Sequence, residues 1–246
     1  MLSNKGYSIL KASVNADELV KIKTDLTMKP KVNFNMGVKD NNDNTFLLYK
    51  ETESRLYVPR YYGLTKIGLP KTNKITHGSD IAVEFKGKLR DYQLEPVNKF
   101  LEAAKDPLKM GGIISVPCGY GKTIMSLYIA CQLKKKTMFI SHKDFLNQQF
   151  LDTIKVFAPN AEIGIIKQNK VNVVNKDFIV ASLQSLAMRE YDEEIFRDIG
   201  FVIIDEVHHT GAQVFSRAFK NLNNPIILGL SATLNRKDGM RKVFEY

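Results

Sequence analysis

The stretch GGIISVPCGYGKTIMSLYIACQLKKKTMFIS, Gly111–Ser141, reads in turn as a strand, a loop, a helix and a second strand. Its two apolar runs are nearly continuous, as in strands that are buried on both faces of a sheet. Four more runs of this kind occur in the chain, EIGII, DFIVAS, GFVIID and PIILGL. Strands that alternate with helical patterns from about residue 89 onward predict an α/β fold with a parallel sheet and helices on both faces.

The loop inside this stretch, Ser115–Thr123, has the shape of a phosphate-binding loop. Gly119 and Gly121 would let the backbone curl around an anion, and the amides of the following helix would point at it. Lys122 would lie between the β- and γ-phosphates, and the Thr123 hydroxyl would bind Mg²⁺. Because Val116 replaces the first glycine of the strict pattern, a chance turn that contains Gly-Lys-Thr is the alternative.

A second signal, VIIDEVHH at Val202–His209, places two acids at the end of an apolar strand. Asp205 would hold Mg²⁺, and Glu206 would act as general base on the attacking water. The alternative is a surface pair of acids that caps the next helix. We do not expect zinc at His208 and His209, because adjacent histidines rarely share one ion and no third ligand is evident.

Two further stretches gain meaning only beside these signals. GLSATLNRKDG, Gly229–Gly239, follows an apolar run, and its small hydroxylic residues would hydrogen-bond His208 or the carboxylates. LRDYQ, Leu89–Gln93, precedes the first strand, and the amide of Gln93 has the donor and acceptor that an adenine edge requires. Taken alone, LRDYQ is also an ordinary helix start.

Composition limits the classes of protein that the chain can represent. It has 246 residues, 44% of them apolar, which is enough for one or two domains with real cores. Its net charge of +10 favours partners that carry phosphate, although basic proteins without nucleic-acid partners are common. Two cysteines cannot form a disulfide framework, and neither a membrane span nor a secretion signal is evident. We expect an intracellular, soluble protein.

The first 80 residues do not continue the alternation and predict a small α+β domain. Asn15–Pro30 resembles a capped helix, and Thr45–Gly63 reads as strand, turn, strand and an aromatic-rich exit. The polar stretch Pro70–Asp80 is the best linker candidate, so the expected domains are 1–80 and 81–246. The aromatic exit would form either the core of this domain or a surface for nucleic acid; its residues are Tyr57, Arg60, Tyr61 and Tyr62.

The four signals together resemble the first RecA-like motor domain of superfamily 2 helicases, over residues 87–246. LRDYQ is similar to the glutamine motif, PCGYGKT to motif I, DEVH to motif II in its DExH form, and SAT to motif III. FISHKDFLNQQ resembles motif Ia and VASLQSL resembles motif Ib. Helicases of this superfamily often lack the first glycine of motif I. The detailed likeness is to XPB-type repair helicases and to the transcript-release helicases of large nucleocytoplasmic DNA viruses.

The resemblance implies roles for single residues and an enzyme that uses ATP and Mg²⁺. Nucleotide and metal would be bound by Arg90, Gln93, Gly119, Tyr120, Gly121, Lys122, Thr123 and Asp205. Catalysis would fall to Lys122, Asp205, Glu206 and His208. Coupling of hydrolysis to movement would fall to Ser231 and Thr233. The nucleic-acid backbone, of DNA rather than RNA, would be contacted by Ser141, His142, Lys143, Ser182, Gln184 and Ser185.

The resemblance also implies a second RecA-like domain with an arginine finger, which the sequence does not contain. We therefore expect a piece of a longer helicase, weakly active by itself, that works with transcription or repair machinery in a cytoplasmic virus factory or a nucleus. A nucleic-acid- or partner-binding module with a vestigial ATP site stays open as the alternative. A GTPase or small-molecule kinase is disfavoured, because VNKDF has the wrong spacing for a guanine-reading motif.

Overall fold

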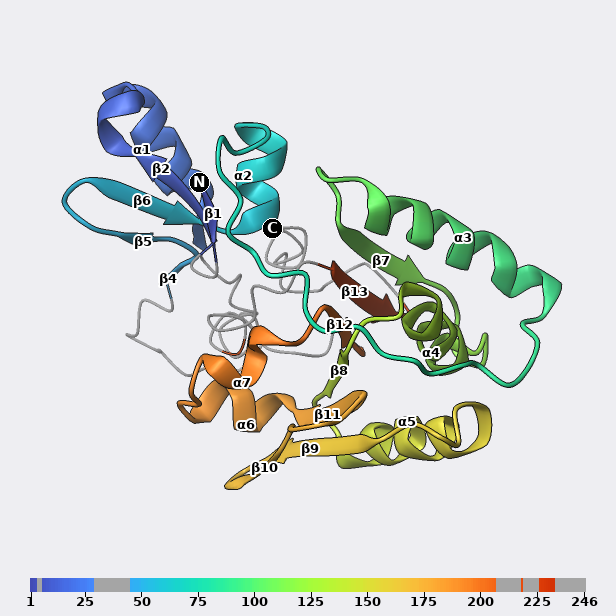
Figure 1. Ribbon diagram of the computed structural model, residues 1–246. Helices are drawn as coiled ribbons and strands as arrows, with labels where there is room; N and C mark the ends of the chain where they lie inside the picture. The colour runs from blue at the N-terminus through green and yellow to red at the C-terminus, as the bar shows by residue number, and fades with distance from the viewer. Residues whose placement is uncertain (4–5, 29–44, 207–217, 219–225, 233–246) are drawn as a thin grey trace, which may run out of the picture. The chain divides into compact units, whose positions relative to one another are not determined.

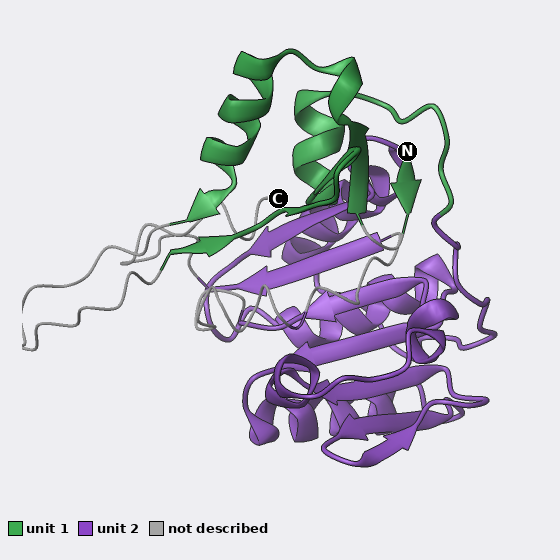
Figure 2. Ribbon diagram, turned by 90° about the vertical axis from the view of Figure 1, so that its left-hand side faces the viewer, with its two compact units in different colours: residues 1–74, 235–246 green, residues 75–234 purple. Residues whose placement is uncertain are grey.

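The computed structural model describes residues 1–3, 6–28, 45–206, 218 and 226–232. It divides into two compact units, Met1–Lys74 with Asn235–Tyr246, and Ile75–Leu234. Figure 2 draws the two units in different colours. The division falls between Lys74 and Ile75, inside the stretch predicted as a linker.

The larger unit is built on a sheet of seven strands in the order β10-β9-β11-β8-β12-β13-β7. Neighbouring strands are parallel, except that β10 runs antiparallel to β9 at one edge. The strands are β7 (Gly111–Ser115), β8 (Thr137–Ser141), β9 (Ile163–Lys167), β10 (Lys170–Asn172), β11 (Phe178–Ser182), β12 (Phe201–Ile204) and β13 (Ile226–Ser231). The six predicted apolar runs correspond to six of these strands. The antiparallel β10 was not predicted.

The helices of this unit cover both faces of the sheet. The elements α3 (Asp91–Lys105), α4 (Lys122–Leu133) and α5 (Asp144–Phe157) pack side by side on one face. The short helices α6 (Leu183–Met188) and α7 (Glu194–Arg197) lie on the other (Figure 1). The connections through α4 and α5 cross the sheet in one direction, and the connection from β11 to β12 crosses it in the other. Because such connections are right-handed, the helices of the β11–β12 connection lie on the opposite face. The predicted α/β, RecA-like class is confirmed.

Aromatic residues fill the space between the sheet and α5. The ring of Phe139 on β8 stacks on Phe150 of α5 with centroids 4.0 Å apart, and Phe178 on β11 meets Phe150 edge-on. All three side chains are fully buried. Burial on both faces explains why the central strands read as continuous apolar runs.

The smaller unit contains both helices and strands. Its antiparallel sheet has the order β1-β2-β6-β5, and β3 pairs with β4. Asn15 caps the first helix as expected, by accepting a hydrogen bond from the Glu18 amide at 2.7 Å. The elements are β1 (Leu2–Ser3), β2 (Gly6–Leu10), the 3-10 helix η1 (Lys11–Ser13), α1 (Ala16–Asp25), β3 (Thr27–Met28), β4 (Phe46–Leu47), β5 (Lys50–Glu51), β6 (Arg55–Val58) and α2 (Arg60–Lys66).

The aromatic exit of this unit forms α2 and contributes to its core. Tyr62 and Arg60 are buried, and the Tyr62 hydroxyl donates to Asp25 at 3.1 Å. The Arg60 guanidinium lies over the ring of Tyr61 and donates to its hydroxyl at 2.6 Å. Gly63 is required here because a Cβ would stand 2.2 Å from the Tyr7 ring. Of the two interpretations offered for this stretch, the core interpretation holds for Arg60 and Tyr62.

Candidate active site

Three neighbouring strands deliver the predicted nucleotide motifs to one edge of the sheet. β12, β13 and β7 are adjacent and parallel, so the chain segments that follow their carboxyl ends meet there. The loop after β7 is tied to the end of β13, because the Val116 amide donates to the Ser231 carbonyl at 3.1 Å. Ser231 is fully buried at this junction. Motifs that are more than 100 residues apart in the sequence therefore share one site.

The two glycines of the loop have the conformation that the motif requires. Gly119 has φ of +80° and Gly121 has φ of +87°, in the left-handed region that favours glycine. Gly121 also caps α4, whose first turn leaves amides without acceptors within the helix. Val116, in the place of the absent glycine, packs against the hydrophobic core. The valine in place of the glycine therefore attaches the loop to the core by an apolar contact.

Lys122 connects the loop to the acidic pair. Its ammonium lies 3.3 Å from the Val116 carbonyl, 3.5 Å from the Pro117 carbonyl and 4.0 Å from the Glu206 carboxylate. Both Lys122 and Glu206 have little solvent exposure, with side chains 10% and 18% exposed. The Lys122 charge offsets part of the negative charge of the acidic pair.

The two acids have different environments. Asp205 is buried, and burial together with the neighbouring Glu206 charge raises its pKa to about 6. The Glu206 amide donates to the Asp205 carboxylate at 3.0 Å, and Glu206 has φ of +53°. A non-glycine residue in this region is strained, and such strain is concentrated at functional sites. The two carboxylates thus have different surroundings; the separate tasks expected of them stay a prediction.

Gln93 holds the phosphate loop against α3. Its Oε1 accepts from the Arg90 amide at 2.9 Å, and its Nε2 donates to the Tyr120 carbonyl at 2.8 Å. Gln93 is buried, and a Cβ on Gly121 would stand 2.4 Å from its Nε2. The amide predicted to select adenine is therefore engaged by the chain's own backbone, once as part of the α3 capping box and once on the loop.

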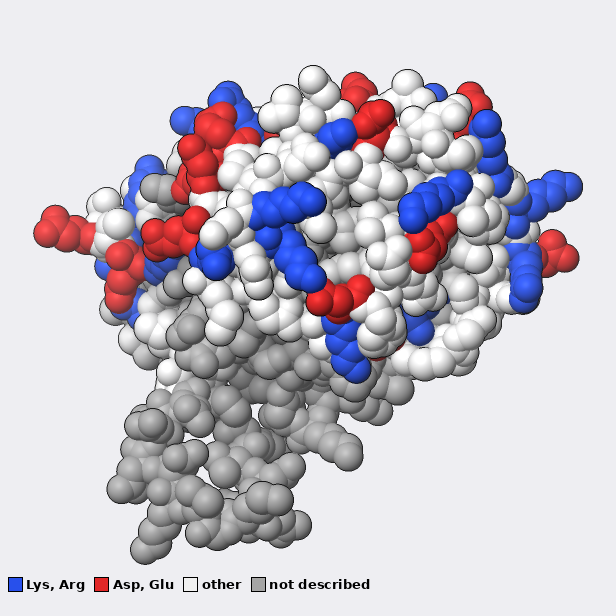
Figure 3. All heavy atoms as spheres, turned by 90° about the horizontal axis from the view of Figure 1, so that it is seen from below, with Lys and Arg blue, Asp and Glu red and all other residues white. Residues whose placement is uncertain are grey.

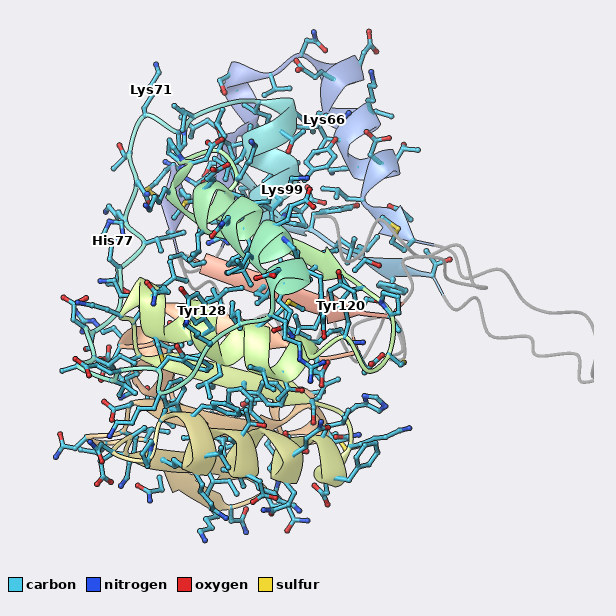
Figure 4. The ribbon with its side chains drawn as sticks, turned by 90° about the vertical axis from the view of Figure 1, so that its right-hand side faces the viewer. Lys66, Lys71, His77, Lys99, Tyr120 and Tyr128 are labelled. Carbon is cyan, nitrogen blue, oxygen red and sulfur yellow. The ribbon has the colours of Figure 1, made fainter. Side chains whose placement is uncertain are left out.

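Tyr92 joins this group and was not predicted. Its ring meets Tyr120 edge-on with centroids 4.6 Å apart, and the Tyr120 hydroxyl donates to the Tyr92 carbonyl at 3.0 Å. Arg90 donates to the Tyr92 hydroxyl at 2.9 Å. Figure 4 shows Tyr120 where the first turns of α3 and α4 approach each other. The sequence signal that could have pointed to this residue is the aromatic side chain directly before Gln93.

The predicted nucleic-acid residues follow the next pair of strands. β8 and β11 are parallel neighbours, with Ser141 opposite Ser182. Gln184 connects the two loops, because its Nε2 donates to the His142 carbonyl at 2.8 Å, while its Oε1 accepts from Ser182 at 3.1 Å. Lys143 and Gln184 are exposed, and His142 and Ser182 are half-buried. These four residues form one continuous surface, hereafter the Ia–Ib surface.

The other two predicted contacts lie beneath this surface. Ser141 is buried, and its hydroxyl bonds the Lys143 carbonyl at 2.9 Å and Asn147 at 2.8 Å. Ser185 is also buried and accepts from the Gln168 amide at 2.9 Å. Both hydroxyls hold loops in place, so any effect they have on nucleic acid passes through their neighbours.

Among its described residues, the face of the molecule seen in Figure 3 has no separate basic patch that would mark it as a nucleic-acid-binding face. Basic and acidic side chains lie side by side on the face visible in Figure 3. In the described part of the chain no group of three or more histidine, cysteine or acidic residues could hold a metal ion, and no helix is long and apolar enough to cross a membrane. His208, His209 and Thr233 lie outside the described residues.

Comparison with protein families agrees with the motifs and the fold. Residues 86–236, more than half of the chain, match the family described as type III restriction enzyme, res subunit. The chain belongs to this family. Curated relatives include a mimivirus protein named "Putative ATP-dependent RNA helicase L396" (Acanthamoeba polyphaga mimivirus), 36% identical over 98% of this chain and 46% of its own length. The "General transcription and DNA repair factor IIH helicase/translocase subunit XPB/SSL2" of Saccharomyces cerevisiae is 29% identical over 65% of this chain and 20% of its own length.

Solved structures confirm the fold. The UvsW helicase of bacteriophage T4 matches with a TM-score of 0.62 and 16% identity, over 94% of this chain and 91% of that one. A Sulfolobus solfataricus SWI2/SNF2 ATPase core in complex with double-stranded DNA matches with a TM-score of 0.54 and 19% identity, over 65% of this chain and 36% of that one. The resemblance to superfamily 2 helicases, with XPB-type and viral members among the relatives, is confirmed. The chain spans less than half the length of the mimivirus relative.

Proposed function

We propose that this chain is the N-terminal unit and first motor lobe of an ATP-dependent helicase or translocase that acts on nucleic acid. The observation that carries the proposal is the approach of the Lys122 ammonium to 4.0 Å from Glu206, at the edge where β7, β12 and β13 end. A phosphate-loop lysine beside a strand-end acidic pair is the arrangement that phosphoryl transfer requires.

The residues of this edge fit Mg²⁺-ATP by the chemistry of their donors. The Thr123 hydroxyl and the Asp205 carboxylate are hard oxygen ligands, which Mg²⁺ prefers. The first turn of α4 and Lys122 offer amides and a cation to phosphate oxygens. Mg²⁺ held by these residues would neutralise charge on the bound phosphates. The raised pKa of Asp205 reflects a buried anion that a cation would stabilise.

The residues of the chain divide the remaining work. Lys122 exchanges its carbonyl contacts for phosphate oxygens, and Glu206 accepts a proton from the attacking water. Gln93 keeps the loop against α3 through the Tyr120 carbonyl. The paired rings of Tyr92 and Tyr120 provide an apolar surface for the adenine base. His208, Ser231 and Thr233 couple the site to movement.

The Ia–Ib surface would hold the nucleic-acid backbone, of DNA rather than RNA. Lys143 supplies charge, and Gln184 and Ser182 supply polar groups that recognise phosphate without reading sequence. Rapid turnover would need an arginine from a second RecA-like domain, because such arginines contribute roughly 10³–10⁵ in rate in related enzymes. Relatives more than twice the length of this chain have room for that domain.

A hydrolysis assay separates the motor from a binding module with a vestigial ATP site. We expect the purified chain to bind a fluorescent ATP analogue weakly with Mg²⁺ and to hydrolyse ATP very slowly. Lys122→Ala should abolish binding, whereas Glu206→Gln should retain binding and lose hydrolysis. Adding a single-stranded oligonucleotide should raise the wild-type rate. Equal rates for the wild type and both variants would favour the binding module, and robust unwinding by this chain alone would contradict the need for a second lobe.

A further inference from the structure

Phe145 is a large apolar side chain that α5 does not bury. It lies in the first turn of the helix and is 62% exposed, while Phe150 and Ile154 of the same helix are buried in the core. The only comparably exposed large apolar residue among the described residues of α5 is Val156, at 65%, near the other end of the helix. Phe145 therefore does not contribute to the core of this unit.

The surroundings of Phe145 suit a flat ring. The Lys143 ammonium lies 5.6 Å from its ring centroid. A shallow hollow of about 510 Å³ begins at Phe145 and continues along α5 past Gln148 and Gln149 to Val156. The one acid that lines it, Asp152, is bonded to Gln148 at 3.0 Å and to Lys155 at 3.1 Å. The Phe145 end of the hollow thus offers a π-face, a cation and amides.

Phe145 is also continuous with the Ia–Ib surface. It is three residues from His142, whose carbonyl is bound by Gln184, and two residues from the exposed Lys143. A strand whose phosphates lie on Lys143 would carry its bases within reach of the Phe145 ring. Stacking on an aromatic side chain is available to every base, because every base has a π-face.

We propose that Phe145 stacks on a nucleobase of a single strand bound along the Ia–Ib surface. The inference rests on the proposed function and narrows its substrate to nucleic acid with accessible bases. Bases inside a duplex are stacked on each other, so the Phe145 contact favours a single strand over a duplex. It adds a base contact to a site that otherwise recognises backbone.

The test measures binding of the full chain to a fluorescent single-stranded 20-mer of thymidine and to a strand of equal length with abasic sites. Phe145→Ala should weaken binding to the thymidine strand by roughly 5- to 150-fold and leave binding to the abasic strand unchanged. Phe145→Tyr should bind like the wild type, and Phe145→Leu like the alanine variant. Val174→Ala, which removes an exposed apolar side chain outside this hollow, is the control and should have no effect.

The salt dependence of binding separates stacking from charge. Phe145→Ala should leave the slope of log K against log salt unchanged, whereas Lys143→Ala should reduce it by about 0.7 for a single strand. Equal binding by Phe145→Ala and the wild type, or equal loss on the abasic strand, would overturn the stacking contact while leaving the proposed function intact. Absence of any binding by the wild type would overturn both.

Discussion

Gly121 meets two demands at one position. Its φ of +87° disfavours any residue with a Cβ, and the Gln93 amide occupies the space that a Cβ would need. The same amide carries the hydrogen bond to the Tyr120 carbonyl. A side chain at position 121 would therefore disturb both the helix cap and the contact that fixes the phosphate loop.

We predict that Gly121→Ala weakens binding of Mg²⁺-ATP at least tenfold and lowers the free energy of unfolding by on the order of 1–3 kcal/mol, the cost of a non-glycine residue in a disfavoured conformation. Gly112→Ala is the control, because a Cβ there meets nothing within 4 Å. Titration with a fluorescent ATP analogue and thermal unfolding measure the two effects. Wild-type behaviour of Gly121→Ala would show that the loop is held by other contacts.

The two cysteines are predicted to differ in reactivity. Cys118 is exposed in the phosphate loop, whereas burial raises the pKa of Cys131 to about 12. Since the thiolate is the reactive form, Cys131 should stay protonated and unreactive at pH 8. At pH 8 a thiol reagent should label one cysteine in the native chain and two after denaturation. Mg²⁺-ATP should slow labelling of Cys118, and no slowing would argue against nucleotide in the loop.

At the scale of elements, Glu51 joins three parts of the smaller unit. It lies on β5 and makes ion pairs with Lys11 of η1 at 2.8 Å and with Lys23 of α1 at 2.7 Å. Hydrogen bonds from Lys11, then Lys23, lower the pKa of Glu51 to about 2. The elements it joins are short, so a shared charge adds to the limited apolar core that they can form.

The low pKa of Glu51 predicts a loss of stability in acid. Because its pKa is lower in the folded than in the unfolded chain, its contribution is present above about pH 4.5 and is lost as the pH falls toward 2. Glu51→Gln should lower the unfolding temperature at pH 7. The difference in unfolding temperature between the variant and the wild type should become smaller as the pH falls toward 2. Glu53→Gln, an exposed neighbour, is the control. A constant difference across this range would contradict the ion-pair role.

At the scale of the whole molecule, the features that could be predicted from the sequence are those fixed by burial on both faces of the sheet. The central strands are continuous apolar runs because both faces of the sheet are covered. Once these strands are recognised, the motifs directly after them are placed at the same edge of the sheet. The strand β10 escaped prediction because all three of its residues are exposed and its sequence has no apolar run. Side-chain partners also escaped, since a motif does not reveal that Ser141 is buried or that Gln93 already bonds the loop.

The cores of the two units are built from different residues, so a ligand of one should leave the amides of the other unchanged. The main hydrophobic core cluster among the described residues contains only residues of the second unit, from Ile81 to Leu230. We predict that Mg²⁺-ATP slows hydrogen exchange in peptides that cover the phosphate loop and Asp205. Peptides from β2 and β6 should exchange at their unliganded rates. At 100 times its dissociation constant the nucleotide would stabilise its unit by about 2.7 kcal/mol.

Lys122→Ala provides the control for this experiment, because it removes the cation that would bind the phosphates while leaving the two cores intact. Mass spectrometry should then show no nucleotide-dependent protection in any peptide. Equal protection of both units in the wild type would mean that they respond as one cooperative body, and the smaller unit would then have to be counted as part of the nucleotide response.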